Sequence, residues 1–156
     1  MSIQNRGFTL IELLVVMAVL GILAMAALPL AEVSVRRDRE HELKRSLWEI
    51  RDAIDAYKRA AEAGAVAVSV GESGYPPSLE ALVSGVPNPK DSGRPRYFLR
   101  RIPRDPFADD SVSAEKTWGL RSFESPADRP RPGADVYDVY SRSDKAGLNG
   151  VALRDW

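Results

Sequence analysis

A long apolar run near the N-terminus constrains this chain more than any other feature. Leu13 to Leu30 are 18 residues without a charge, and counting from Phe8 gives 23 residues in which Glu12 is the one charged side chain. A helix of about 20 apolar residues is long enough to cross a bilayer. Inserting an ionised carboxylate at that depth costs roughly 2.5–3.5 kcal/mol of free energy. A charged residue at such a position therefore indicates a functional role and a binding partner for the charge. The run predicts a single transmembrane helix, and Glu12 predicts a specific interaction within it.

The composition narrows the classes of function. The chain has 156 residues, with 22 Lys and Arg against 22 Asp and Glu, so no overall charge favours a nucleic acid or an acidic substrate. The absence of cysteine excludes disulfides, Cys-ligated metals and thiol nucleophiles. The one histidine, His41, lies among charged neighbours, which is typical of a solvated helix and gives no basis for a catalytic triad. We therefore expect one modest domain, no enzymatic activity and no nucleic-acid partner.

The residues alone leave two simple interpretations of the apolar run. A secretory signal peptide would use Arg6 as its positive charge and the Ala-Met-Ala of residues 24–26 as its cleavage site. Glu12 argues against it because it interrupts the apolar stretch, and Pro29 argues against it because the same apolar texture continues beyond the cut. An ordinary signal anchor is the second interpretation. It explains the length of the run but not the acid.

A third interpretation comes from resemblance. The stretch "RGFTLIELLVVMAVLGILAMAALP" resembles the N-termini of type IV pilins and type II secretion pseudopilins. The resemblance implies that residues 1–7 (MSIQNRG) are a leader removed by prepilin peptidase, that the cut falls between Gly7 and Phe8, and that the amine of Phe8 is then methylated. Glu12 matches the glutamate of that family, and Pro29 matches its helix-kinking proline. Such proteins sit in the bacterial inner membrane with a periplasmic C-terminal domain.

Cleavage at this point would supply the partner that Glu12 requires. A cut before Phe8 creates a cationic amine at membrane depth, and methylation keeps its charge. We expect this amine to pair with Glu12 of a neighbouring subunit during assembly. The charges after the run argue for the opposite orientation, since by the positive-inside rule they would keep the C-terminal domain in the cytoplasm. These basic residues are Arg36, Arg37, Arg39, Lys44 and Arg45, with Asp38, Glu40 and Glu42 among them. We nevertheless expect the periplasmic C-terminal domain that the resemblance implies.

An apolar stripe predicts that the helix continues beyond the membrane. No proline or glycine occurs between Pro29 and Gly64, and apolar residues recur at intervals of three and four positions. They are Leu43, Leu47, Ile50, Ile54, Tyr57 and Ala61. We expect a membrane and assembly half over 8–31, an amphipathic half over 32–63 and a globular region over 64–156. Pro29 should bend or locally unwind the helix, and Gly64 should end it.

The globular region is predicted to be α+β. "YPPSLEALV" predicts a turn and a short helix capped near Ser78, and the segments "RYFLRRI", "TWGLRSF" and "DVYDVYS" predict strands. "VPNPKDSGRP" and "SPADRPRPG" predict irregular loops. Several segments, among them "IPRDPF", "TWGLRS" and a final "RDW", resemble the globular domain of the major, G-type pseudopilin of type II secretion. The expected architecture is therefore pilin-like, with a long N-terminal helix packed on a small antiparallel sheet.

The same resemblance implies a calcium site in the loop "SRSDKAGLNGVALRD". Calcium prefers six to eight oxygen ligands. Asp144 matches the family's first acidic ligand. The second acidic ligand has no clear match, the nearest oxygen donor being the neutral side chain of Asn149, and Ser141 and Ser143 are auxiliary oxygens. The alternative is a polar turn in which Asp144 caps backbone amides and the loop glycines supply unusual dihedral angles.

The sequence thus predicts a non-enzymatic subunit of a periplasmic filament that drives protein export by type II secretion. Its expected partners are other copies of itself, prepilin peptidase, other pseudopilins and the inner-membrane assembly platform. Two alternatives stay open. One is a minor pilin of a type IV pilus or DNA-uptake machine, and the other is a periplasmic binding module released by signal peptidase.

Overall fold

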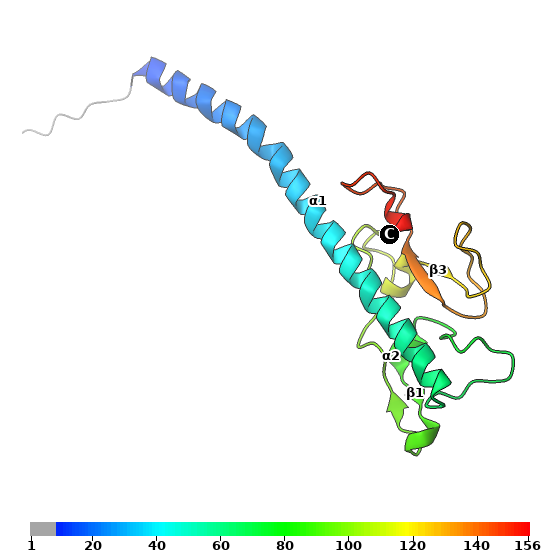
Figure 1. Cartoon of the computed structure of the whole chain (residues 1–156). Helices are drawn as coiled ribbons and strands as arrows, with labels where there is room; N and C mark the ends of the chain where they lie inside the picture. Colours follow the sequence, from blue (N-terminus) through cyan, green and yellow to red (C-terminus); the bar gives the residue numbers. More distant parts are fainter. Residues whose placement is uncertain (1–8) are drawn as a thin grey trace, which may run out of the picture. The chain divides into compact units, whose positions relative to one another are not determined.

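A single helix, α1 (Leu10–Glu62), accounts for about a third of the chain. The computed structural model describes residues 9–156, apart from the side chains of residues 26–29. The chain divides into two compact units, one up to Asp38 and one from Arg39 to Trp156. Figure 1 shows α1 as one unbroken ribbon from its first residue to its last. Pro29 therefore does not unwind the helix, and any bend there stays a prediction.

The predicted apolar stripe of α1 forms one side of the core of the second unit. Leu43, Leu47, Ile50, Ile54 and Tyr57 are all buried. They pack in one cluster with residues from the rest of the unit: Leu79, Leu82, Leu99, Trp118, Val136, Val139 and Leu153. Burial of one face at this spacing is what stabilises an amphipathic helix in a small domain. The stripe thus packs against the protein's own globular region.

The C-terminus of α1 is fixed by a glycine cap. Gly64 has φ +67°, the left-handed conformation in which a side chain would be strained. Its amide donates to the carbonyl of Ala61, and the amide of Ala65 donates to the carbonyl of Ala60. This pair of bonds is the Schellman arrangement that ends many helices. The predicted stop at Gly64 is confirmed.

The segment after α1 contains a short helix and a small hairpin. The predicted short helix is confirmed as α2 (Ala81–Ser84). The Oγ of Ser78 accepts the amide of Ala81 at 3.3 Å, but the N-cap residue is Glu80, which makes no side-chain capping hydrogen bond. Strands β1 (Val86–Pro87) and β2 (Pro95–Arg96) are antiparallel, and the short helix η1 (Pro89–Asp91) lies between them. The sequence predicts only a loop over 86–95, so this hairpin was missed because prolines normally argue against a strand.

The strand predicted over "RYFLRRI" is wrong beyond Arg96. The amides of Phe98 and Leu99 both donate to the carbonyl of Leu82, at 3.0 and 2.9 Å. Because this backbone is bound to the end of α2, it does not form a strand ladder. The apolar residues of the segment anchor it to the short helix instead.

The other two predicted strands form the main hairpin. β3 (Trp118–Arg121) pairs antiparallel with β4 (Asp138–Ser141), with Trp118 opposite Ser141 and Arg121 opposite Asp138. The short helix η2 (Ala114–Thr117) leads into β3, and η3 (Leu153–Asp155) follows β4. The long connection between the strands is irregular, as its prolines predict. The chain is therefore α+β, with one long helix and small antiparallel sheets.

Candidate functional site

Glu12 lies in the first turn of α1. Its amide donates to the Oγ1 of Thr9 at 3.3 Å, and the amide of Leu13 donates to the carbonyl of Thr9 at 3.1 Å. Thr-x-x-Glu is the capping-box pattern, and a negative charge is favourable at the positive end of a helix. Within residues 9–156, no ion pair involves Glu12. Gly7 and Phe8, the predicted cleavage and methylation residues, lie outside the described residues.

The apolar segment that follows Glu12 is exposed along its length. The helix contains an 18-residue window that is long and apolar enough to cross a membrane, and none of that window is buried. Exposed side chains lie all around it, including Leu10, Leu14, Met17 and Leu23. A soluble domain does not leave so large an apolar surface in water. This segment therefore requires an apolar environment, which either lipid or other helices would provide.

The predicted calcium ligands do not form a cage among the described residues. Asp144 is exposed and borders a hollow of about 200 Å³ that Arg142 and Arg154 also line. The Oδ1 of Asn149 accepts the amide of Val151 at 3.1 Å. Within residues 9–156 no group of three or more His, Asp or Glu side chains is placed to hold a metal ion. Calcium binding stays a prediction.

The hydroxyl of Ser141, a predicted auxiliary oxygen, is engaged elsewhere. It donates to Oδ2 of Asp105 at 2.6 Å, and the amide of Phe107 donates to Oδ1 of the same carboxylate at 2.8 Å. Asp105 is only 1% exposed, so these hydrogen bonds compensate for the burial of its polar carboxyl group. The sequence alone does not single out Asp105. Its position before a proline in "RDPF" gave no sign that a residue 36 positions later would bind it.

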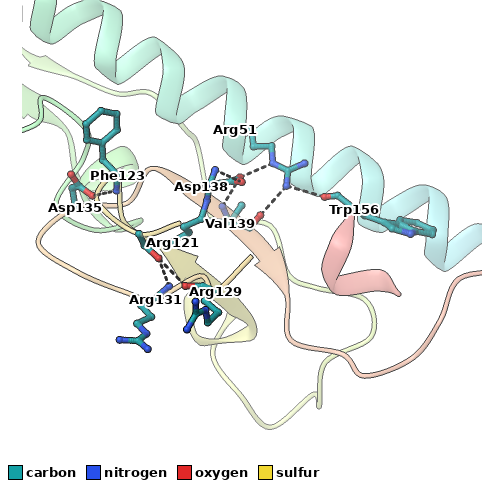
Figure 2. Close-up of polar contacts among 10 residues, drawn as sticks. Arg51, Arg121, Phe123, Arg129, Arg131, Asp135, Asp138, Val139 and Trp156 are labelled. Atoms are coloured by element: carbon teal, nitrogen blue, oxygen red, sulfur yellow. Dashed lines mark hydrogen bonds and ion pairs between the residues drawn. The ribbon is translucent and has the colours of Figure 1, made fainter. Parts of the chain in front are cut away.

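A second buried carboxylate, Asp135, ties together three distant segments. It accepts hydrogen bonds from the hydroxyl of Ser73 and, at 2.8 Å, from the amide of Phe123. Figure 2 shows the contact with Phe123. Burial alone would raise the pKa of Asp135, but the hydrogen bonds from Ser73, Phe123 and Ser122 outweigh it and lower the pKa below its ordinary value. The charged form is therefore the one that the fold stabilises.

Arg51 of α1 joins the helix to the C-terminal half of the unit, as Figure 2 shows. Its Nε donates to Oδ1 of Asp138 at 2.8 Å, and its Nη2 donates to the main-chain oxygens of Val139 and Trp156 at 3.1 and 2.9 Å. Arg121 reaches the other oxygen of Asp138 at 3.4 Å. The periodicity of α1 did not indicate this role, because an arginine beside an apolar stripe is normally solvated.

The chain is similar to known proteins at its N-terminus and over about two thirds of its length. Residues 3–28 match the model of the prokaryotic N-terminal methylation motif. The chain is 31% identical over 111 residues to the type II secretion system core protein G of Vibrio cholerae, covering 69% of this chain and 68% of that protein. The protein of the same name from Pseudomonas aeruginosa is 35% identical over 114 residues, covering 68% and 70%.

The protein of that name from Pectobacterium carotovorum is 29% identical over 113 residues, covering 69% of this chain and 65% of the relative. No solved structure shows significant similarity to the chain.

Proposed function

Because this chain belongs to the family of type II secretion system core protein G, we propose that it is a structural subunit of a periplasmic pseudopilus. Prepilin peptidase removes residues 1–7 and methylates Phe8. The mature subunits leave the inner membrane and assemble into a short filament that drives protein export. The role is mechanical, and no catalytic residue is assigned.

The exposed apolar half of α1 is the observation that carries this proposal. Its first residues lie within the matched methylation motif, which covers residues 3–28. None of its 18-residue apolar window is buried. A helix of this kind is stable in lipid before assembly and among identical helices after it. A released periplasmic module has no use for such a surface.

The proposal also assigns a location and partners. The chain spans the inner membrane once, with residues 39–156 in the periplasm. Its partners are other copies of itself, prepilin peptidase, other pseudopilins and the assembly platform. The basic residues after the apolar run, Arg36 and Arg37 foremost, oppose this orientation by the positive-inside rule. A cysteine placed at exposed Val70 tests it, because a reagent that does not cross the inner membrane should label that thiol.

Mass spectrometry of the mature N-terminus tests the processing step. We expect a chain that begins at Phe8 and carries one methyl group on its amine. Replacing Gly7 with leucine should leave the full precursor in the membrane, whereas the same change at Gly21 within the apolar run should leave processing intact. A mature chain beginning at Ala27 would instead establish the signal-peptide alternative.

Electron microscopy of cells that overproduce the chain tests assembly. We expect filaments whose bulk is this one subunit. If the chain were found only as a trace component of a filament made from another protein, the minor-pilin alternative would replace the proposal.

A further inference from the structure

The family resemblance implies a calcium ion in the last loop, but the side chains of this chain do not suit one. Asp144 is the single carboxylate bordering the hollow of about 200 Å³ in that loop, and Arg142 and Arg154 border it too. Two guanidinium groups beside one carboxylate oppose a divalent cation. Calcium sites normally combine several carboxylate and carbonyl oxygens at 2.3–2.6 Å. The fit to calcium is therefore poor.

The loop is closed by its own backbone. The amide of Leu153 donates to the carbonyl of Lys145 at 3.0 Å, and the amide of Gly147 donates to the carbonyl of Val151 at 2.7 Å. An isolated bridge pairs Ala146 with Ala152, and Gly150 turns the chain with φ +79°. The Oδ1 of Asn149, the nearest match to the second calcium ligand, accepts a backbone amide inside this turn. These hydrogen bonds occupy oxygens of the loop that could otherwise act as metal ligands, namely the carbonyls of Lys145 and Val151 and the Oδ1 of Asn149.

Three residues of α1 hold the closed loop against the helix. The amide of Leu148 donates to Oε1 of Glu40 at 2.7 Å, although the two residues are 108 positions apart. The ammonium group of Lys44 lies 4.4 Å from the centre of the Trp156 ring, within the range of a cation–π contact. Arg51 binds the main-chain oxygen of Trp156 at 2.9 Å. The three residues lie on one face of α1, four and seven positions apart, so they span about three turns.

The loop and the last residue also interlock. A Cβ on Gly147 would lie 2.3 Å from the ring of Trp156, so the indole occupies the space that any larger residue would need. Leu153 is buried in the core beside it. Glu40 is only 8% exposed, so loss of its side chain would leave the amide of Leu148 without this acceptor in a mostly buried place.

We propose that Glu40, Lys44 and Arg51 of α1 form a clamp that fixes residues 142–156 and that this segment folds without a divalent cation. The clamp takes the structural place of the ion. Secretion filaments built from this chain should accordingly keep their subunit fold when calcium is removed.

Hydrogen–deuterium exchange on the full chain in detergent tests the clamp. Glu40→Ala should speed exchange of the peptide containing Leu148 roughly tenfold or more. Glu42→Ala is the matched control, since it removes an exposed carboxylate from the same helix. Lys44→Met, which leaves the buried core intact, should speed exchange around Trp156. If either variant behaves as Glu42→Ala does, the clamp is wrong.

A second experiment compares the chain in the presence of calcium with the chain in the presence of a chelator. Adding millimolar calcium or EDTA should change neither the exchange of residues 142–156 nor the melting temperature, and Asp144→Ala should be silent in both measurements. Slower exchange or a higher melting temperature with calcium would overturn the metal-free proposal. The test uses unassembled chain, so failure of the pseudopilus proposal would not affect it.

Discussion

The guanidinium of Arg51 is bonded to the carboxylate of Asp138, 87 residues further along the chain, with 2.8 Å between Nε and Oδ1. One arginine thereby connects α1 with β4, and its Nη2 also binds the main-chain oxygens of Val139 and Trp156. The planar fork of an arginine can make these contacts together, whereas a lysine ammonium cannot. This residue fixes the position of the hairpin along the helix.

Arg51→Lys should therefore destabilise the chain although it keeps the charge. We expect a loss of about 1–2 kcal/mol in the free energy of unfolding, since the contacts are charge-assisted but the side chain is partly exposed. Chemical denaturation in detergent measures it. Arg59→Lys is the control, because Arg59 and Asp52 form an exposed pair at 3.9 Å that should contribute little. Equal stability of the two variants would contradict the role of Arg51.

Stability should depend on the charge of Asp135. The pKa of Asp135 is lowered in the folded chain, because hydrogen bonds from Ser73, Phe123 and Ser122 outweigh the effect of burial. Its unfolded value is about 3.9. The stabilisation is therefore complete above roughly pH 4 and is lost as the pH falls through the lower folded value.

Melting temperatures of the unmutated chain and of Asp135→Asn, measured between pH 3 and 7, check this sign. The variant should melt at a lower temperature at pH 7, and the gap should narrow in acid. Glu124→Gln controls for general titration, since it removes an exposed carboxylate from the connection between β3 and β4. A gap that stays constant with pH would show that the charge of Asp135 is irrelevant.

Gly119 of β3 should not tolerate alanine. A Cβ there would lie 2.3 Å from ring atoms of Tyr140, the residue opposite it on β4. The ring would have to move, and overpacking of this kind costs about 1–3 kcal/mol. Thermal unfolding measures the loss. Combining Gly119→Ala with Tyr140→Ala should cost less than the sum of the single changes, because the clash disappears.

Much of the fold could be predicted because its signals are local. The apolar stripe from Leu43 to Ala61, the stop at Gly64 and the alternation around Val139 each depend on neighbouring residues. The strand over "RYFLRRI" failed because a distant group, the carbonyl of Leu82, binds its amides. The hairpin formed by β1 and β2 was missed because its prolines are typical of a loop and not of a strand. A hydrogen-bond partner outside the segment decided the first case, and prolines within the hairpin decided the second.

The residues of the candidate site also differ in whether neighbouring or distant residues reveal their role. Glu12 could be singled out because an acid within an apolar run is a local anomaly. Glu40 and Arg51 could not, since they look like ordinary charges on a helix until Leu148 and Trp156 lie beside them. Asp144 was chosen by resemblance, which indicates where a ligand stands but not that Arg142 and Arg154 border the same hollow.

Glu12 should be required for assembly of the filament but not for processing of the chain. If it pairs with the amine of Phe8 in a neighbouring subunit, Glu12→Gln should be cut after Gly7 and inserted normally, since a neutral residue enters the bilayer more easily. Filaments and secretion should nevertheless be lost. The capping role at the start of α1 predicts a different result, because glutamine also serves in a capping box. The neutral variant therefore separates the two roles.

Immunoblots for processing, electron microscopy for filaments and an assay of an exported protein measure the three steps. Glu12→Asp should retain partial assembly, because it keeps the charge with a shorter reach. Val16→Leu is the matched control within the same apolar segment and should be close to silent, since lipid and helix packing accept either side chain. Normal filaments from Glu12→Gln would refute intersubunit pairing and leave helix capping or recognition by the peptidase as the reason for the acid.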